Sequence, residues 1–388
     1  MTSAYNNQFV YNLAVIKEAK RWAKHGFIKT DQLTAINEEY KTPFYHPNLI
    51  IRILLFVATL LAISGVTGLF GLFIVDTGKT LISIACILYG IGSFFALEKM
   101  FIEKNHFKSG VTEAVMYHAC GFTIGGVAGL ADFDSTQLIL MMCLLVFSFA
   151  AWRYLDLLTT LASLLSFAGI LFYNFYEASG ILQQVIPFVF MVAFGFLYWV
   201  AKKFKGNSEY KLWANNLLII ESISLLFIYA SGNYLVVREL SVNLLELSLE
   251  DGADIPFAYL FYFFTVIIPT AYLYFGIKNK DLVLLRVSLL ALAFSVFTFK
   301  YYYSLGHTEI TLTLAGVVLI SMAILLMRYL KINRAGFTGE DILSNRWAEM
   351  NVEAFIISQT MGGNTSKSNG KDFGGGGDSG GGGASTTF

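Results

Sequence analysis

Residues 50–75 read IIRILLFVATLLAISGVTGLFGLFIV, and Arg52 is the only charged side chain among them. As a helix, this segment is long enough to cross the hydrocarbon core of a bilayer, which is about 30 Å thick. Since lipid offers backbone amides no water to bond, membrane spans of this kind must be helical. Similar runs recur along the chain and predict about ten spans, at residues 50–75, 80–97, 111–130, 137–152, 157–176, 181–201, 214–235, 257–276, 282–299 and 309–328. The sequence therefore predicts an all-α, polytopic transmembrane helical bundle.

The composition supports a chain that lies mostly in lipid. Hydrophobic residues make up 56% of it and charged residues only 14%, whereas soluble domains average roughly 25% charged residues. The net charge is +0, so no basic field points to a nucleic-acid partner. The three cysteines lie inside predicted spans without metal-ligand spacing, so we expect neither a metal nor another cofactor. The lipid bilayer is the expected partner, and the oligomeric state stays open.

The distribution of basic residues predicts the orientation. Of the 27 Lys and Arg residues, only Lys79, Arg238 and Lys300 fall on one side of the predicted spans. Basic residues collect on the cytoplasmic side of membrane proteins. With an even number of spans, both termini are therefore expected in the cytoplasm, and the protein in the plasma (inner) membrane.

The two ends of the chain differ from its centre. Residues 1–48 predict a cytoplasmic pair of amphipathic helices that precedes the ten-helix transmembrane domain of residues 49–330. Residues 331–361 predict a further cytoplasmic amphipathic helix. Residues 362–388 are rich in glycine and too polar to bury a core, so we expect a disordered tail. These ends are the natural binding sites for a cytoplasmic protein partner.

The N-terminal pattern carries a resemblance. Residues 14–40, AVIKEAKRWAKHGFIKTDQLTAINEEY, followed by the first span, resemble predicted bacterial membrane proteins of the domain-of-unknown-function 2157 type. The ending FGGGGDSGGGGASTTF is similar to Gly-Ser tails of some bacterial membrane-anchored proteins. The resemblance implies a bacterial inner-membrane location, and it implies no established activity or catalytic residue.

Four ionisable side chains inside the predicted spans form a candidate intramembrane polar site: His118, Glu221, Glu113 and Arg286. Such groups cost at least about 2.5 kcal/mol each at the bilayer centre, so they are rare and often functional. Counting from the cytoplasmic boundary matches the depth of Glu221 with His118, and that of Glu113 with Arg286. His118 with Glu221 is interpreted either as a protonation-sensitive site or as a hydrogen-bonded clasp between helices. Glu113 and Arg286 lie close enough to the interface to reach headgroups or water instead.

Small residues and prolines predict how the helices pack. Glycines repeat at short spacing in two spans, where they would allow close helix approach. They are Gly121, Gly125 and Gly129 in residues 111–130, and Gly65, Gly68 and Gly71 in residues 50–75. Pro187 and Pro269 each remove an amide donor and predict kinks in the sixth and eighth spans.

The sequence favours a transporter-like protein for a small solute or ion, because many spans combine with a few buried ionisable groups. The alternative is a non-transporting assembly or sensory protein that recruits partners through its cytoplasmic helices and tail. No HExxH, GxSxG or clustered acidic motif occurs in the chain, so we expect no enzyme.

Overall fold

The structure is a computed structural model, and it describes residues 3–24, 26–45, 47–176, 181–244 and 254–302 with a few isolated positions up to residue 328. These ranges contain helices and no strand, and Tyr45 and His106 form an isolated β-bridge. In chain order the helices are α1 (Asn7–Lys24), α2 (Thr30–Glu39), α3 (Leu49–Ile74), α4 (Lys79–Ala96), α5 (Val111–Leu130), α6 (Thr136–Tyr154), α7 (Leu157–Tyr176), α8 (Ile181–Gln184), α9 (Ile186–Lys205), α10 (Ala214–Gly232), α11 (Tyr234–Asn243), α12 (Ala258–Lys278) and α13 (Leu282–Tyr302). Three short helical turns, η1 (Val75–Thr77), η2 (Leu97–Ile102) and η3 (Ser208–Trp213), extend or connect them.

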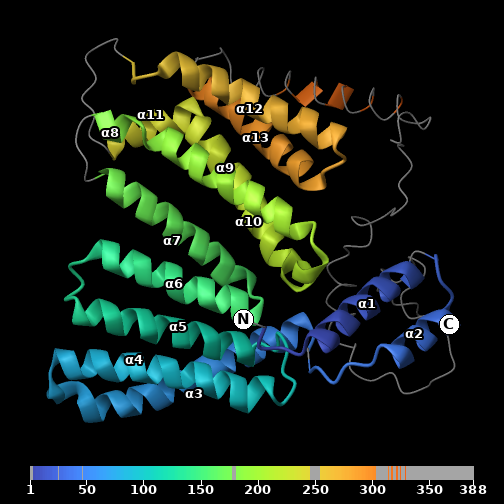
Figure 1. Cartoon of the computed structure of the whole chain (residues 1–388), viewed down its shortest axis with the longest axis vertical. Helices are drawn as coiled ribbons and strands as arrows, with labels where there is room; N and C mark the ends of the chain where they lie inside the picture. Colours follow the sequence, from blue (N-terminus) through green and yellow to red (C-terminus); the bar gives the residue numbers. More distant parts are fainter. Residues whose placement is uncertain are drawn as a thin grey trace, which may run out of the picture.

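Eight helices of the described part are long and apolar enough to cross a membrane, which confirms an all-α, multi-pass membrane protein. They are α3, α4, α6, α7, α9, α10, α12 and α13. Helix α5 has 20 residues and lies in the same bundle (Figure 1), but Glu113, His118 and its glycines make it less apolar. The predicted span 309–328 falls mostly outside the described residues, and residues 331–361 and 362–388 fall wholly outside them. The count of about ten spans therefore stays a prediction.

The helices lie side by side roughly in chain order, from α3 at one edge of the bundle to α12 and α13 at the other (Figure 1). Helices α1 and α2 lie beyond one end of the bundle, which we call the helix-pair end; the opposite end is the far end. The connections after η2, α6, α9 and α12 all reach the helix-pair end. This alternation of direction is what consecutive spans require.

The helix pair is attached to the bundle by aromatic contacts. Phe44 stacks on Phe107 with ring centroids 5.0 Å apart, and Tyr5 meets Phe107 edge-on at 4.8 Å. Next to them, the Tyr45 amide donates to the Asn105 carbonyl at 2.8 Å. Buried aromatic pairs contribute about 0.5–1.5 kcal/mol each beyond their burial. The predicted N-terminal pair of helices is thus present and rests on the end of the bundle.

Close packing of α4 on α5 depends on glycines that only partly match the prediction. A Cβ atom on Gly126 would lie 2.7 Å from the Ser83 carbonyl oxygen, and one on Gly129 would lie 2.5 Å from the Ser83 hydroxyl. At Gly121 and Gly125 a Cβ would meet no described atom within 4 Å, so for these two the packing prediction is wrong in the described part. The reason is rotation, since at 100° per residue Gly121 and Gly125 point about 140° and 100° away from Gly126, which faces α4.

The other predicted packing residues also differ from expectation. Gly65, Gly68 and Gly71 on α3 have no described neighbour within 4 Å of an added Cβ. Pro187 lies in the first turn of α9, where proline costs little, because the chain breaks between α8 and α9. A kink at Pro187 inside a span was therefore the wrong expectation. Pro269 does lie inside a helix, α12, as predicted.

Gly126→Ala should lower the free energy of unfolding by about 1–3 kcal/mol, because the new methyl group collides with the α4 backbone. Gly125→Ala is the matched control and should be neutral or slightly stabilising, since alanine favours helix and the site is open. Unfolding by detergent titration of the purified protein measures both. Equal effects of the two variants would contradict this packing.

Candidate functional site

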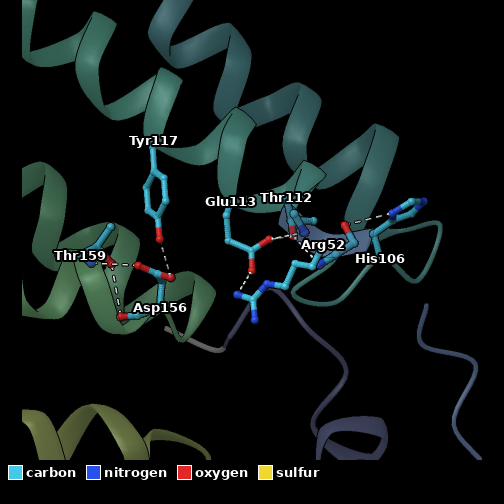
Figure 2. Close-up of polar contacts among 9 residues, drawn as sticks. Arg52, His106, Thr112, Glu113, Tyr117, Asp156 and Thr159 are labelled. Carbon is cyan, nitrogen blue, oxygen red and sulfur yellow. Dashed lines mark hydrogen bonds and ion pairs between the residues drawn. The ribbon is translucent and has the colours of Figure 1, made fainter. Parts of the chain in front are cut away.

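Charged and polar side chains from α3, α5 and the α6–α7 connection meet at the helix-pair end of the bundle (Figure 2). We call this group the polar cluster; it consists of Arg52, Lys108, Thr112, Glu113, Tyr117 and Asp156. Of these, only Glu113 was among the residues expected from the sequence.

Glu113 joins α5 to α3. Its Oε1 forms an ion pair with Arg52, and its Oε2 accepts from the Gly110 amide and the Thr112 hydroxyl, both at 2.8 Å. The bond from Gly110 also caps the first turn of α5, where a carboxylate is favoured by the helix dipole. The Glu113 side chain is 8% exposed and that of Arg52 is 38% exposed. Both carboxylate oxygens are therefore engaged, as in a clasp between helices.

Asp156 occupies the sharp turn between α6 and α7. Leu155 has a left-handed backbone, φ 56°, which reverses the chain and directs Asp156 into the cluster. Its Oδ2 accepts from the Tyr117 hydroxyl at 3.1 Å, and its Oδ1 accepts from the Thr159 amide at 2.8 Å (Figure 2). Asp156 is 9% exposed, so its carboxylate lies inside the cluster rather than in solvent.

A small polar cavity lies between the two carboxylates. Its volume is about 10 Å³, and Tyr5, Lys108, Glu113 and Asp156 are among its lining residues. A cavity of this size holds about one water. Burial lowers the pKa of Lys108, while nearby Asp156 acts in the opposite direction. Burial raises the pKa of Tyr5, which also lines the cavity.

Further ion pairs tie other helices together near the helix-pair end. The Arg153 guanidinium donates to both oxygens of Glu98, at 2.9 and 2.8 Å. Lys205 of α9 donates to Glu221 of α10 at 2.6 Å, and the Glu221 side chain is 1% exposed. Sequence reasoning missed these partners because it searched inside the spans. Long Lys and Arg side chains at span ends can reach inward, and this is the signal that could have found them.

Neither predicted pair of ionisable residues forms. Glu221 binds Lys205 rather than His118, and Glu113 binds Arg52 rather than Arg286. Arg286 is exposed on α13 and forms no ion pair within the described ranges. Equal depth does not make two helices neighbours: α5 packs on α3, α4 and α6, whereas α10 packs on α7, α9, α12 and α13.

A long apolar groove runs between α3 and α4, and α5 forms its floor. We call it the lateral groove; its half nearer the helix-pair end has a volume of about 740 Å³ and its far half about 550 Å³. Tyr89 lines both halves, and His118 lines the first. No residue of α3 is buried, and groove-lining Ala62 and Gly92 are exposed, so the groove opens sideways.

No protein-family model, curated protein or solved structure matched the chain.

Proposed function

We propose that this protein is transporter-like and handles a small solute that reaches it from the lipid, through the lateral groove. We also propose, from the basic residues gathered at the helix-pair end, that this end and both termini are cytoplasmic in a bacterial inner membrane. The observation that carries the proposal is the groove, which combines a large apolar volume with an opening on the side of the bundle. Apolar concave sites with few polar groups are the usual form of ligand sites.

Helix α3 is packed tightly at the helix-pair end and loosely elsewhere, which would allow it to tilt and so to widen or narrow the groove. At the helix-pair end, Gly110 lies directly against the α3 backbone at Arg52 and Phe56, and Arg52 pairs with Glu113. Beyond this contact α3 has no buried residue. A helix held at one end and loosely covered elsewhere can tilt at small cost, because few contacts must break.

The described part of the chain gives less support to a pathway for a water-soluble ion through the polar cluster. The cavity between Glu113 and Asp156 has room for about one water, and the apolar side chains of Leu97 and Met116 also line it. Both oxygens of Glu113 and of Asp156 already accept hydrogen bonds. Glu221 is bound by Lys205, so no carboxylate of this set is left to bind a passing cation.

Transport can be tested with proteoliposomes that contain a trace of lipid labelled with a nitrobenzoxadiazole fluorophore. Dithionite bleaches label in the outer leaflet only, so wild-type protein should raise the bleached fraction as labelled lipid crosses. Ala62→Trp fills the groove and should abolish the acceleration, while Leu61→Trp, on the exposed side of the same helix, should not. The assay is run with labelled lipids whose head groups are neutral or anionic. If wild-type protein accelerates the crossing of neither lipid between the leaflets, the transport proposal fails.

A second function is favoured by one observation on the helix pair. Tyr11, Trp22 and Phe27 are large apolar side chains that are 49%, 46% and 56% exposed there. Exposed aromatic residues are enriched in protein interfaces. If the protein recruits a cytoplasmic partner through this surface, Trp22→Ser should abolish binding of that partner. The crossing of labelled lipid in the liposome assay should stay as in the wild type.

A further inference from the structure

His118 presents an imidazole to the lateral groove without a hydrogen-bond partner. Its Nε2 is buried and unbonded, and no described residue forms a hydrogen bond with the side chain. A buried polar group without a partner costs about 1–3 kcal/mol. The free-energy cost is not relieved where no water can bond the group. An unpaired imidazole nitrogen in such a place indicates a ligand that supplies the missing hydrogen bond.

The depth of His118 restricts the charge of that ligand. His118 lies eight residues beyond Gly110 along α5, which corresponds to about 12 Å at 1.5 Å per residue. With the boundary of the hydrocarbon core taken at Gly110, where α5 begins, the imidazole lies well inside a core about 30 Å thick. Charged groups are costly at this depth, so a phosphate or carboxylate head would stay nearer the surface. The group that meets His118 should therefore be neutral.

Aromatic rings around His118 restrict the shape. The Tyr89 ring lies 5.5 Å from the imidazole and the Phe122 ring 4.5 Å from it, measured between centroids. Tyr89 and Phe122 also contact each other, at 4.9 Å. Flat rings pack favourably against aromatic side chains at such distances. Tyr89 lines both halves of the groove, so a ring held here has apolar space for a tail on either side.

We propose that the lateral groove binds an isoprenoid quinone or a molecule of the same chemistry, with a flat neutral ring, carbonyl acceptors and a long hydrocarbon tail. The imidazole N–H of His118 donates to a ring carbonyl, the ring packs on Tyr89 and Phe122, and the tail follows α3. The Nε2 atom is enclosed and unbonded in the structure, so the imidazole must turn to bring an N–H to the ligand, and no hydrogen bond has to break for it to do so. This names the ligand class of the groove and rests on the proposed function.

The test is equilibrium binding to the full chain in lipid nanodiscs, measured by thermophoresis with a decyl-tailed naphthoquinone. Wild-type protein should bind it saturably, and His118→Phe should raise the Kd about three- to tenfold, the range of one lost hydrogen bond. His118→Gln keeps an N–H donor and should retain most of the affinity. His106→Phe makes the same change outside the groove and should leave the Kd unaltered.

A second measurement needs no variant. Decylnaphthalene has the same rings and tail without carbonyls, and wild-type protein should bind it more weakly than the quinone. Equal binding of the two compounds would overturn the quinone assignment and leave the apolar groove, and so the proposed function, in place. Stronger binding of a polyprenyl phosphate would overturn it in favour of a charged head. Binding of none of these compounds would remove the quinone proposal, and the liposome assay would then decide the proposed function by itself.

Discussion

Lys205→Met should lower the free energy of unfolding by about 3–5 kcal/mol, because it leaves a buried carboxylate without its counter-charge. Glu221 is 1% exposed, and Lys205 is its hydrogen-bond partner within the described residues. Lys205 itself is 35% exposed, so we expect the lower part of this range. Detergent titration of the purified protein measures the loss.

Two companion variants make this prediction specific. The double variant Lys205→Met with Glu221→Gln removes the stranded charge and should recover most of the stability. Lys203→Met deletes the same charge from the same end of α9, where the ammonium lies over Trp199 at 5.2 Å, and should cost under about 1 kcal/mol. If Lys205→Met and Lys203→Met behave alike, the ion pair does not contribute as described.

Gly110→Ala should have the second large effect, because the position combines a glycine backbone with a backbone contact. Its φ is +89°, and an added Cβ would lie 2.1 Å from the Arg52 carbonyl oxygen and 3.0 Å from the Phe56 amide. The strained backbone costs about 1–3 kcal/mol. The collision adds about 1–3 kcal/mol, since neither backbone can give way as a flexible side chain would. The free energy of unfolding should fall by the sum of both.

Gly78→Ala separates the two causes. Gly78 has φ +92° and nothing within 4 Å of an added Cβ among the described residues, so alanine there suffers strain without collision. Gly110→Ala should therefore be clearly more destabilising than Gly78→Ala in the same unfolding assay. A similar loss in the two variants would mean that α3 does not rest on Gly110.

The positions of most helices could be predicted from the sequence, because a run of apolar residues indicates a membrane helix without knowledge of its neighbours. The run of apolar residues at 50–75 became α3, and the predicted span 111–130 has the bounds of α5. The turn before Pro187 was missed because apolar residues lie on both sides of it. Gln183 and Gln184, which interrupt the apolar run, and a proline suited to a first turn were the local signs of a new helix.

The polar partners could not be read from the sequence because they depend on which helices are neighbours. Depth counting placed Glu113 level with Arg286, yet Arg52 reaches Glu113 from α3. The same uncertainty applied to His118, whose surroundings are aromatic rings of α4 and α5 rather than a carboxylate. Glu113 carried one local signal, since a glutamate three residues after Gly110 is typical of a helix cap.

The most direct measurement asks what fills the lateral groove. A nitroxide attached at Ala62→Cys, with Cys86, Cys120 and Cys143 replaced by alanine, reports collisions with oxygen, which dissolves in lipid, and with a water-soluble nickel complex. We expect frequent oxygen collisions and few nickel collisions at residue 62, as for a label at Leu61, whose side chain is 70% exposed on the same helix. Nickel collisions as frequent as at Lys104, an exposed residue outside the spans, would mean a water-filled route. Few collisions with either reagent would mean that protein covers the groove. Both results would contradict a groove open to lipid.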